Sequence, residues 1–221
     1  MNKLVIVGGA AVVLVGAFVI GMNVYRGQQT EKVSQIAATD SDSPFNRPDA
    51  PMIGTIMAKV EIVEYFDPAC ESCREFYPYV KNVLEQHKNQ VRLSLRYAAF
   101  HKGSDYVVQI LEAARLQGFD IYVKSLETVL DAQPIWANHN NPNPSMVWAL
   151  LGNTGIDIER AKREMNDPRI LARLKQDAAD IVKLNVRKTP TLFINGKPLR
   201  EFSPEGLASQ VASEVRAAYK N

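Results

Sequence analysis

Residues 60–73 read VEIVEYFDPACESC, and the interpretation of the whole chain starts from this stretch. Val60–Phe66 is a short run of apolar, β-branched and aromatic residues, which is typical of a buried strand. From Cys73 to about His87, apolar side chains recur at helical spacing, with Pro78 as an expected kink. The only two cysteines of the chain therefore lie where a strand ends and a helix begins.

The spacing of Cys70 and Cys73 predicts thiol–disulfide exchange. Two intervening residues bring the sulfurs within bonding reach across one helical turn. Cys70 lies at the helix N-terminus, where unpaired N–H groups and the helix dipole stabilise a thiolate. The thiolate is the species that attacks disulfides, so Cys70 is the predicted nucleophile and Cys73 the predicted resolving thiol.

Two cysteines also allow other interpretations. They are too few for a disulfide-stapled scaffold or for an all-cysteine zinc site. A structural disulfide and a Cu(I)-binding pair stay open as alternatives, although the six methionines are not clustered, which argues against a copper shuttle. Zinc would need two further ligands, and the three histidines are scattered along the sequence (His87, His101 and His139). No metal site is predicted.

Glu64 is a candidate acid beneath the cysteine pair. It lies on the strand face shared by Ile62 and Phe66, and burial among apolar side chains should raise the pKa of its carboxyl group. A carboxyl group in this position could relay a proton to or from Cys73. An ion pair with a neighbouring lysine such as Lys59 is the alternative.

Thr189 and Pro190 immediately precede a predicted strand over residues 191–195. Proline is permitted at the start of a strand, and its peptide bond can be cis. A cis-proline turn beside the sulfurs would expose the Thr189 backbone for pairing with an extended substrate. Both residues are therefore candidates for substrate binding, with a trans proline at a strand edge as the alternative.

The remaining elements predict a mixed sheet and a long helical block. Val91–Tyr97 alternates apolar and polar residues, as a strand does. Residues from about 104 to 185 are largely helical, with a loop over Gln133–Pro144, and they are too numerous for a simple connection. Asn195-Gly196 is a two-residue hairpin signal that leads to a predicted return strand over Pro198–Phe202.

Several conspicuous residues are interpreted as structural. We interpret His101 as a loop residue, and the two tryptophans and the Asn-His-Asn run as anchors of the helical block. Three basic residues in that block predict a solvated helix face. These residues are Trp136, Trp148, Asn138-His139-Asn140, Arg160, Lys162 and Arg163.

Two motifs together carry a resemblance. FDPACESC at residues 66–73 follows the first predicted strand, and KTPTLFING at residues 188–196 lies near the end of the chain. The combination resembles the thioredoxin superfamily. With the helical insertion at about 104–185, residues 57–219 are similar to DsbA-like periplasmic disulfide oxidoreductases. The resemblance implies an α/β fold: a thioredoxin-like mixed sheet flanked by helices, with an inserted helical subdomain.

The resemblance also implies a function. It implies a redox enzyme with Cys70 as nucleophile, Cys73 as resolving thiol, Glu64 as buried acid and Pro190 as cis-proline. No cofactor is expected beyond the redox-active Cys70–Cys73 disulfide. The expected partners are unfolded or thiol-containing proteins and a membrane-bound or soluble redox partner.

One position departs from the family pattern. Many oxidases of the family have a histidine or another non-acidic residue between the cysteines, whereas this chain has Glu71 followed by Ser72. A negative charge beside Cys70 should raise the pKa of that thiol. A less stabilised thiolate makes a weaker oxidant, so Glu71 and Ser72 are candidates for redox tuning. The direction of electron flow stays open between an oxidase and a reductase or isomerase.

The N-terminal segment differs from the rest of the chain. Leu4–Met22 carries no charge, and as a helix it would span about 28 Å, close to a bilayer core of roughly 30 Å. Residues 1–26 are interpreted as a membrane anchor, with a cleaved signal peptide as the alternative. Residues 27–52 predict a polar tether. The thioredoxin-like domain is placed at residues 53–221, in the periplasm, where disulfides persist.

Charge argues against one class of partner. The chain has 26 basic and 24 acidic residues, and the excess belongs to Lys3 and Arg26, which flank the apolar segment. The remainder is balanced and shows no basic footprint of nucleic-acid binding.

Overall fold

The computed structural model describes residues 14–25, 27–28 and 43–220. The chain divides into two compact units, Met1–Ser43 and Pro44–Asn221. In the first unit, residues 14–25 are helical and their side chains are exposed. None of the helices in the described ranges combines the length and apolar character that a membrane crossing needs. Half of the predicted anchor and most of the tether, at residues 1–13, 26 and 29–42, lie outside the described residues.

The second unit is built around a five-stranded mixed sheet in the order β1-β3-β2-β4-β5. β2 pairs with β3 in parallel, and the other neighbouring strands pair antiparallel. The strands are β1 (Met52–Ile53), β2 (Val60–Phe66), β3 (Val91–Tyr97), β4 (Thr191–Ile194) and β5 (Lys197–Pro198). The predicted α/β class and mixed sheet are confirmed.

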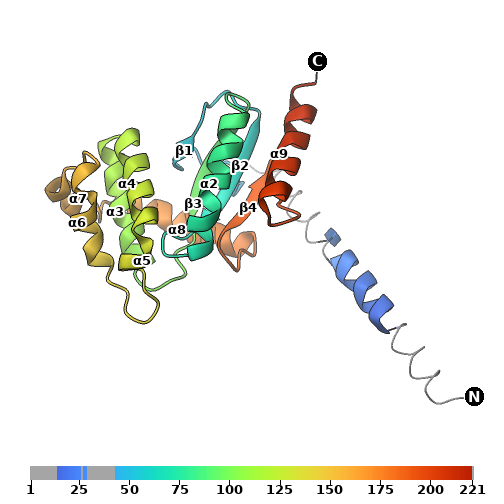
Figure 1. Cartoon of the computed structure of the whole chain (residues 1–221), viewed down its shortest axis with the longest axis horizontal. Coiled ribbons are helices and arrows are strands. Elements are labelled where there is room, and N and C mark those ends of the chain that lie inside the picture. Colours follow the sequence, from blue (N-terminus) through green and yellow to red (C-terminus); the bar gives the residue numbers. More distant parts are fainter. Residues whose placement is uncertain (1–13, 26, 29–42, 221) are drawn as a thin grey trace, which may run out of the picture. The chain divides into compact units, whose positions relative to one another are not determined.

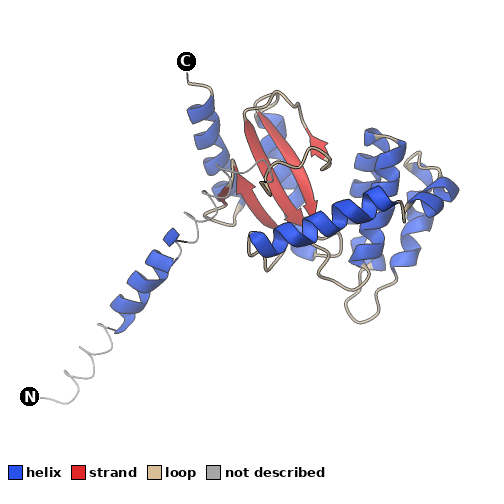
Figure 2. Cartoon of the chain, turned by 180° about the vertical axis from the view of Figure 1, so that it is seen from behind, coloured by secondary structure: helices blue, strands red, loops and turns tan. Residues whose placement is uncertain are grey.

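Helices cover both faces of this sheet. α2 (Glu71–Gln86) packs with α9 (Pro204–Ala218) on one face, and α8 (Pro168–Lys183) crosses the other (Figures 1 and 2). The helical block lies to one side of the sheet (Figure 1). Its α-helices are α3 (Ser104–Gln117), α4 (Phe119–Asp131), α5 (Gln133–Trp136), α6 (Val147–Leu150) and α7 (Ile158–Glu164).

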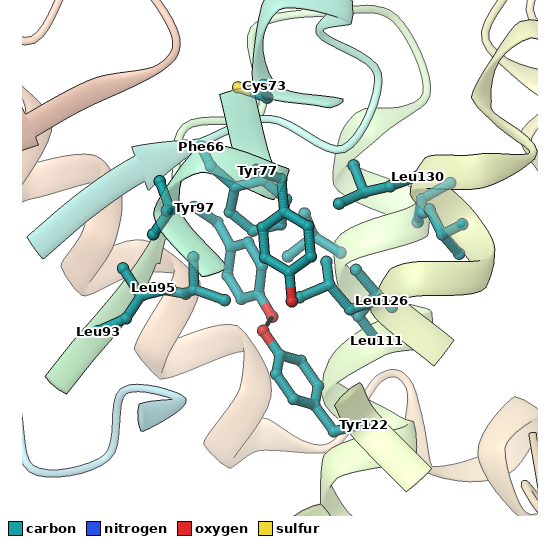
Figure 3. Packing of buried hydrophobic residues seen from close by; sticks show 14 of the residues in the cluster. Phe66, Cys73, Tyr77, Leu93, Leu95, Tyr97, Leu111, Tyr122, Leu126 and Leu130 are labelled. Carbon is teal, nitrogen blue, oxygen red and sulfur yellow. Dashed lines mark hydrogen bonds between the residues drawn. The ribbon is translucent and has the colours of Figure 1, made fainter. Parts of the chain in front are cut away.

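The helical block shares one continuous core with the sheet. The Tyr97 hydroxyl on β3 lies 3.0 Å from that of Tyr122 on α4, and it donates a hydrogen bond of 2.9 Å to Glu112 on α3. Figure 3 shows the two tyrosines pointing at each other among leucines from the sheet and the block. Cys73 lies at the edge of this cluster, so the insertion supports the cysteine pair from beneath.

Three predicted boundaries were wrong. The return strand covers only Lys197–Pro198, because the Arg200 amide donates to the Gln210 side chain of α9 instead of to β4. The segment Gln133–Pro144, predicted as a loop, begins with α5. The compact unit begins at Pro44, so residues 44–52 are not part of a tether. The polar composition of residues 44–52 gives no sign of their long-range contacts. One of these contacts is the pairing of β1 with β3.

A second long-range contact involves what we call the arginine cluster (Arg96, Asp177 and Asp180). Arg96 on β3 is 1% exposed, and its Nε and Nη2 atoms donate to Asp177 and Asp180 of α8, each at 2.5 Å. Arg47 pairs with Asp180 at 2.8 Å, and the Pro44 carbonyl accepts from Arg96. Helix α8 covers the face of β3 that carries Arg96 and supplies both carboxylate partners.

Candidate active site

Cys70 occupies the N-cap of α2, at the junction that the sequence predicted. Its carbonyl oxygen accepts hydrogen bonds from the amides of Cys73 and Arg74, which begins the helix. Both thiols are free, and the residues are 7% and 1% exposed. The Cys70 thiol donates to the Thr189 carbonyl over 3.3 Å, and the Asp67 amide donates to the Cys73 sulfur over 3.5 Å. Cys70 therefore faces the Thr189 turn, whereas Cys73 is enclosed.

The two thiols differ sharply in acidity. A hydrogen bond from Cys73 lowers the pKa of Cys70 to about 5, and the Thr189 contact and the amides of Cys73 and Ser72 contribute to this, against a smaller effect of burial. Burial raises the pKa of Cys73 far above its ordinary value, and the charge of Glu64 adds to this. At neutral pH the pair consists of one thiolate and one protonated thiol.

Glu64 lies on the central strand β2, between Leu95 of β3 and Leu192 of β4, and it is 1% exposed. Burial, reinforced by the charge of Cys70, raises the pKa of this carboxyl group to about 8. Its Oε2 atom has no hydrogen-bond partner among the described residues. The alternative partner Lys59 instead donates to the Ala218 carbonyl.

The turn before β4 is the third part of the site. The Thr189–Pro190 peptide bond is cis, as the sequence predicted. Pro190 is buried, Thr189 is partly exposed, and the Thr189 carbonyl accepts from the Cys70 thiol. The structure thus brings Thr189 and Pro190 to Cys70 from more than a hundred residues away in the sequence.

The surroundings of Cys70 as a whole act against the shift expected from Glu71 alone. The pKa of Cys70 lies well below its ordinary value, not above it. The Glu71 carboxylate lies 2.6 Å from Nε2 of His139. Its own backbone amide lowers the pKa of Glu71, and His139 contributes. Ser72 is exposed and contributes through its backbone amide.

Sequence reasoning missed Asp67, a fully buried carboxylate directly after β2. Oδ1 accepts from the Ala69 amide and the Ser104 hydroxyl, and Oδ2 accepts from the amides of Phe100 and His101. Oδ2 also lies 2.8 Å from Nδ1 of the His101 ring. An aspartate in the strand-to-helix turn was a visible signal, because short polar side chains cap turns and loops. Asp67 ties the cysteine loop to the segment after β3.

Gln133 was also missed, because the sequence placed it in a loop. It lies on α5, is 1% exposed, and donates through Nε2 to the carbonyls of Pro68 and Cys70 at 2.8 and 2.9 Å. The helical block therefore holds the backbone of the cysteine loop directly. Among the described residues, no group of three or more histidine, cysteine or acidic side chains could hold a metal ion.

The family model described as Thioredoxin matches residues 46–212, which include the whole site. The chain belongs to the thioredoxin family. Within this family, disulfide bond formation protein D of Bacillus subtilis is 26% identical over 164 residues, which is 69% of this chain and 71% of that protein. The Na⁺/H⁺ antiporter NhaA of Herminiimonas arsenicoxydans is 24% identical over 143 residues, but these are 65% of this chain and only 22% of the antiporter.

Solved structures show that the thioredoxin-family fold here includes the helical block. A thioredoxin-like oxidoreductase from Silicibacter pomeroyi has a TM-score of 0.68 and 26% identity, over 81% of this chain and 99% of that one. The thiol-disulfide exchange protein alpha-DsbA2 of Wolbachia pipientis has a TM-score of 0.70 and 16% identity, over 86% and 98%. Oxidised BdbD of Bacillus subtilis has a TM-score of 0.68 and 23% identity, over 76% and 93%. The chain is thus a DsbA-like member of the thioredoxin superfamily, grouped with its thiol–disulfide oxidoreductases.

Proposed function

We propose that this thioredoxin-family protein oxidises thiols of other proteins to disulfides through Cys70 and Cys73. The observation that supports this best is the difference in acidity within the pair: the pKa of Cys70 is lowered to about 5 and that of Cys73 is raised. A stabilised Cys70 thiolate favours the reduced form of the pair, and a pair that prefers to be reduced is an oxidant. The direction left open by the sequence is therefore proposed to be oxidation.

The reaction begins with the Cys70–Cys73 disulfide and a substrate that carries two thiols. A substrate thiolate attacks the Cys70 sulfur, the bond between the cysteines breaks, and Cys73 leaves with the electron pair. The Cys73 sulfur takes a proton from Glu64, whose raised pKa of about 8 keeps it protonated at neutral pH. The second substrate thiolate then attacks the substrate sulfur of the mixed disulfide, and Cys70 leaves as a thiolate. The substrate has lost two electrons, and the cysteine pair has gained them.

Each remaining site residue has a place in this scheme. The partly exposed Thr189 backbone beside Cys70 supports pairing with an extended substrate, with Pro190 beneath it. Glu64 recovers its proton from solvent after each turnover. Ser72 contributes to the acidity of Cys70 through its amide, and the charge of Glu71, which would oppose the thiolate, is paired with His139.

The test is oxidation of a reduced peptide dithiol by the oxidised protein. Wild type is expected to turn over, and Cys70→Ser to lose all activity. Cys73→Ser cannot form the internal disulfide, so it is expected to oxidise no peptide, but when it is mixed with the oxidised peptide its Cys70 thiolate attacks the peptide disulfide and forms a mixed disulfide. The pair is expected to have a reduction potential near roughly −130 mV, whereas roughly −270 mV would mark a reductase. A wild-type rate no higher than that of Cys70→Ser would refute the proposal.

A Cu(I)-binding module is the competing function from another class. Two thiolates can hold this soft ion. Because the pKa of Cys73 is raised, the pair offers only one thiolate at neutral pH, which disfavours this use. Tight Cu(I) binding without peptide oxidation would favour the module.

We also propose that the domain acts outside the cytoplasm, attached through residues 1–26 to the inner membrane and served by a membrane-bound or soluble redox partner. The uncharged run at Leu4–Met22 supports attachment. Alkaline phosphatase fused after residue 221 is expected to be active, and carbonate washing is expected to leave the chain in the membrane. Release by the wash would favour a cleaved signal peptide, and an inactive fusion would refute the location.

A further inference from the structure

Two histidines that are far apart in the sequence meet beside the cysteine pair. His101 follows β3 and His139 lies in the loop after α5, yet their ring centroids are 5.5 Å apart. Each ring contacts an acid that flanks Cys70 in the chain. His101 Nδ1 lies 2.8 Å from Asp67 Oδ2, and His139 Nε2 lies 2.6 Å from Glu71 Oε1. The two rings therefore border the N-terminus of α2.

His101 is held in place by a buried acid that favours the protonated form of its ring. Asp67 is fully buried, and backbone amides hold both oxygens of its carboxylate: the Ala69 amide donates to Oδ1 and the Phe100 amide to Oδ2. Partial burial of the ring lowers the pKa of His101, but the hydrogen bond to Asp67 and the charges of Asp67, Cys70 and Glu71 raise it by more. Since Cys70 loses its proton near pH 5, the imidazole of His101 is protonated while the thiolate forms.

His139 acts on a different charge. Glu71 is the first residue of α2, and its carboxylate lies next to Cys70 in the chain. An unpaired negative charge there would oppose the thiolate. The His139 ring, which is 60% exposed, reaches this carboxylate from the helical block and contributes to lowering the pKa of Glu71. The charged or titratable groups at this rim are Asp67, Cys70, Glu71 and the two histidines.

We propose that His101 and His139 form a histidine rim that sets the acidity of Cys70. His101 supplies a positive charge that favours the thiolate, and His139 cancels the opposing charge of Glu71. Both are positioning residues, because neither exchanges electrons nor bonds to the reacting sulfurs. The histidine rim would favour the proposed oxidation, and this inference rests on that proposed function. The effect of the rim on the Cys70 thiol can nevertheless be measured without any substrate.

The test measures thiolate absorbance of reduced protein against pH and the redox equilibrium with glutathione. His101→Asn keeps a donor for Asp67 and removes the charge, and it is expected to reduce the acid dissociation constant of Cys70 roughly three- to tenfold. The glutathione equilibrium should shift toward oxidised protein by a similar factor. The matched control is His87→Gln, at the other end of α2 and about 25 Å along the helix, where no change is expected.

His139→Gln should reduce the same dissociation constant about two- to threefold. Glu71→Gln removes the charge that His139 cancels, so adding His139→Gln to that background is expected to change nothing, whereas His101→Asn keeps its full effect. Circular dichroism and thermal midpoints confirm that the variants are folded, as the exposure of both rings leads us to expect.

The rim is refuted if His101→Asn changes the Cys70 titration no more than His87→Gln does. It is also refuted if the effect of His139→Gln is the same with and without Glu71. These results are independent of turnover: a protein that titrates as expected but oxidises no peptide would refute the proposed function and leave the rim in place.

Discussion

The arginine cluster and the cysteine pair are both buried, but the buried ionisable groups have bonded partners in the first and lack them in the second. In the arginine cluster, Arg96 has a carboxylate on two of its nitrogens and a backbone carbonyl on the third. Beneath the cysteines, Glu64 has an oxygen without a partner among the described residues. The polar groups of the arginine cluster are bonded to partners from several elements of the fold. The Glu64 carboxyl group lacks such partners and keeps a proton that it can transfer.

This difference separates structural from chemical use of buried charge. A buried carboxylate with good partners keeps its charge and holds elements together, whereas one without partners keeps its proton. The raised pKa of Glu64, about 8, is the second case. We expect substitutions in the arginine cluster to change stability without changing the chemistry of each folded molecule, and substitutions near the cysteines to change both.

The largest loss of stability is expected from Arg96→Met. It leaves Asp177 buried without its main partner and removes one of the two arginines paired with Asp180, and breaking a buried ion pair in this way costs about 3–5 kcal/mol. Urea unfolding measures the loss, and the rate of peptide oxidation per folded molecule should not change.

Arg92→Met is the matched control on the same strand. Arg92 pairs with Glu61 at 2.7 Å, but both side chains are more than 20% exposed (24% and 21%). Water screens this pair, so the expected loss is about 1 kcal/mol or less. Equal losses in the two variants would contradict the distinction between a satisfied buried cluster and a screened surface pair.

Glu64→Gln should have a stabilising effect that depends on pH. The pKa of this carboxyl group is raised from 4.5 to about 8, so the folded state keeps a proton that the unfolded state gives up. Stability from that proton is fully present below pH 4.5 and is lost as the pH rises through 8. Glutamine cannot ionise, so the reduced variant should match wild type near pH 4 and exceed it by about 5 kcal/mol at pH 9.

Urea unfolding at both pH values measures this effect, with Glu61→Gln as the control. Glu61 is on the same strand and is bonded to Arg92 and Ser94, so its substitution should not stabilise the protein at either pH. A Glu64→Gln variant that gains nothing between pH 4 and pH 9 would show that this carboxyl group is ionised in the folded protein.

Apart from the control variants, the smallest expected change in stability is that of Gln133→Met. It keeps the shape of the side chain but leaves the carbonyls of Pro68 and Cys70 without their donor, which costs about 1–2 kcal/mol. Gln117→Met removes an exposed pair of hydrogen bonds to Asp157, so water replaces them and the loss should be under about 1 kcal/mol. Thermal unfolding compares the two. A smaller loss at Gln133 would mean that α5 does not support the cysteine loop.

Much of the fold and part of the site could be predicted from local patterns. The long strands β2 and β3, the start of α2 at the cysteines, and the hairpin turn followed directly from side-chain period and turn chemistry. Glu64 was found because a charged residue on an apolar strand face is conspicuous. Gln133, Asp67 and the two histidines were not found as a group, because their partners lie more than thirty residues away in the sequence.

By itself, the sequence determined where the two thiols lie, since spacing within one helical turn and a position at the helix N-terminus are local properties. Only the tertiary structure decided how acidic Cys70 is and where Arg96 lies. The acidity depends on the hydrogen bond from Cys73, on burial of the thiol and on Thr189, which the fold brings to Cys70 from a distant part of the chain. The burial of Arg96 depends on α8 covering the far face of the sheet. Charge and burial act through space, so only the folded chain sets them.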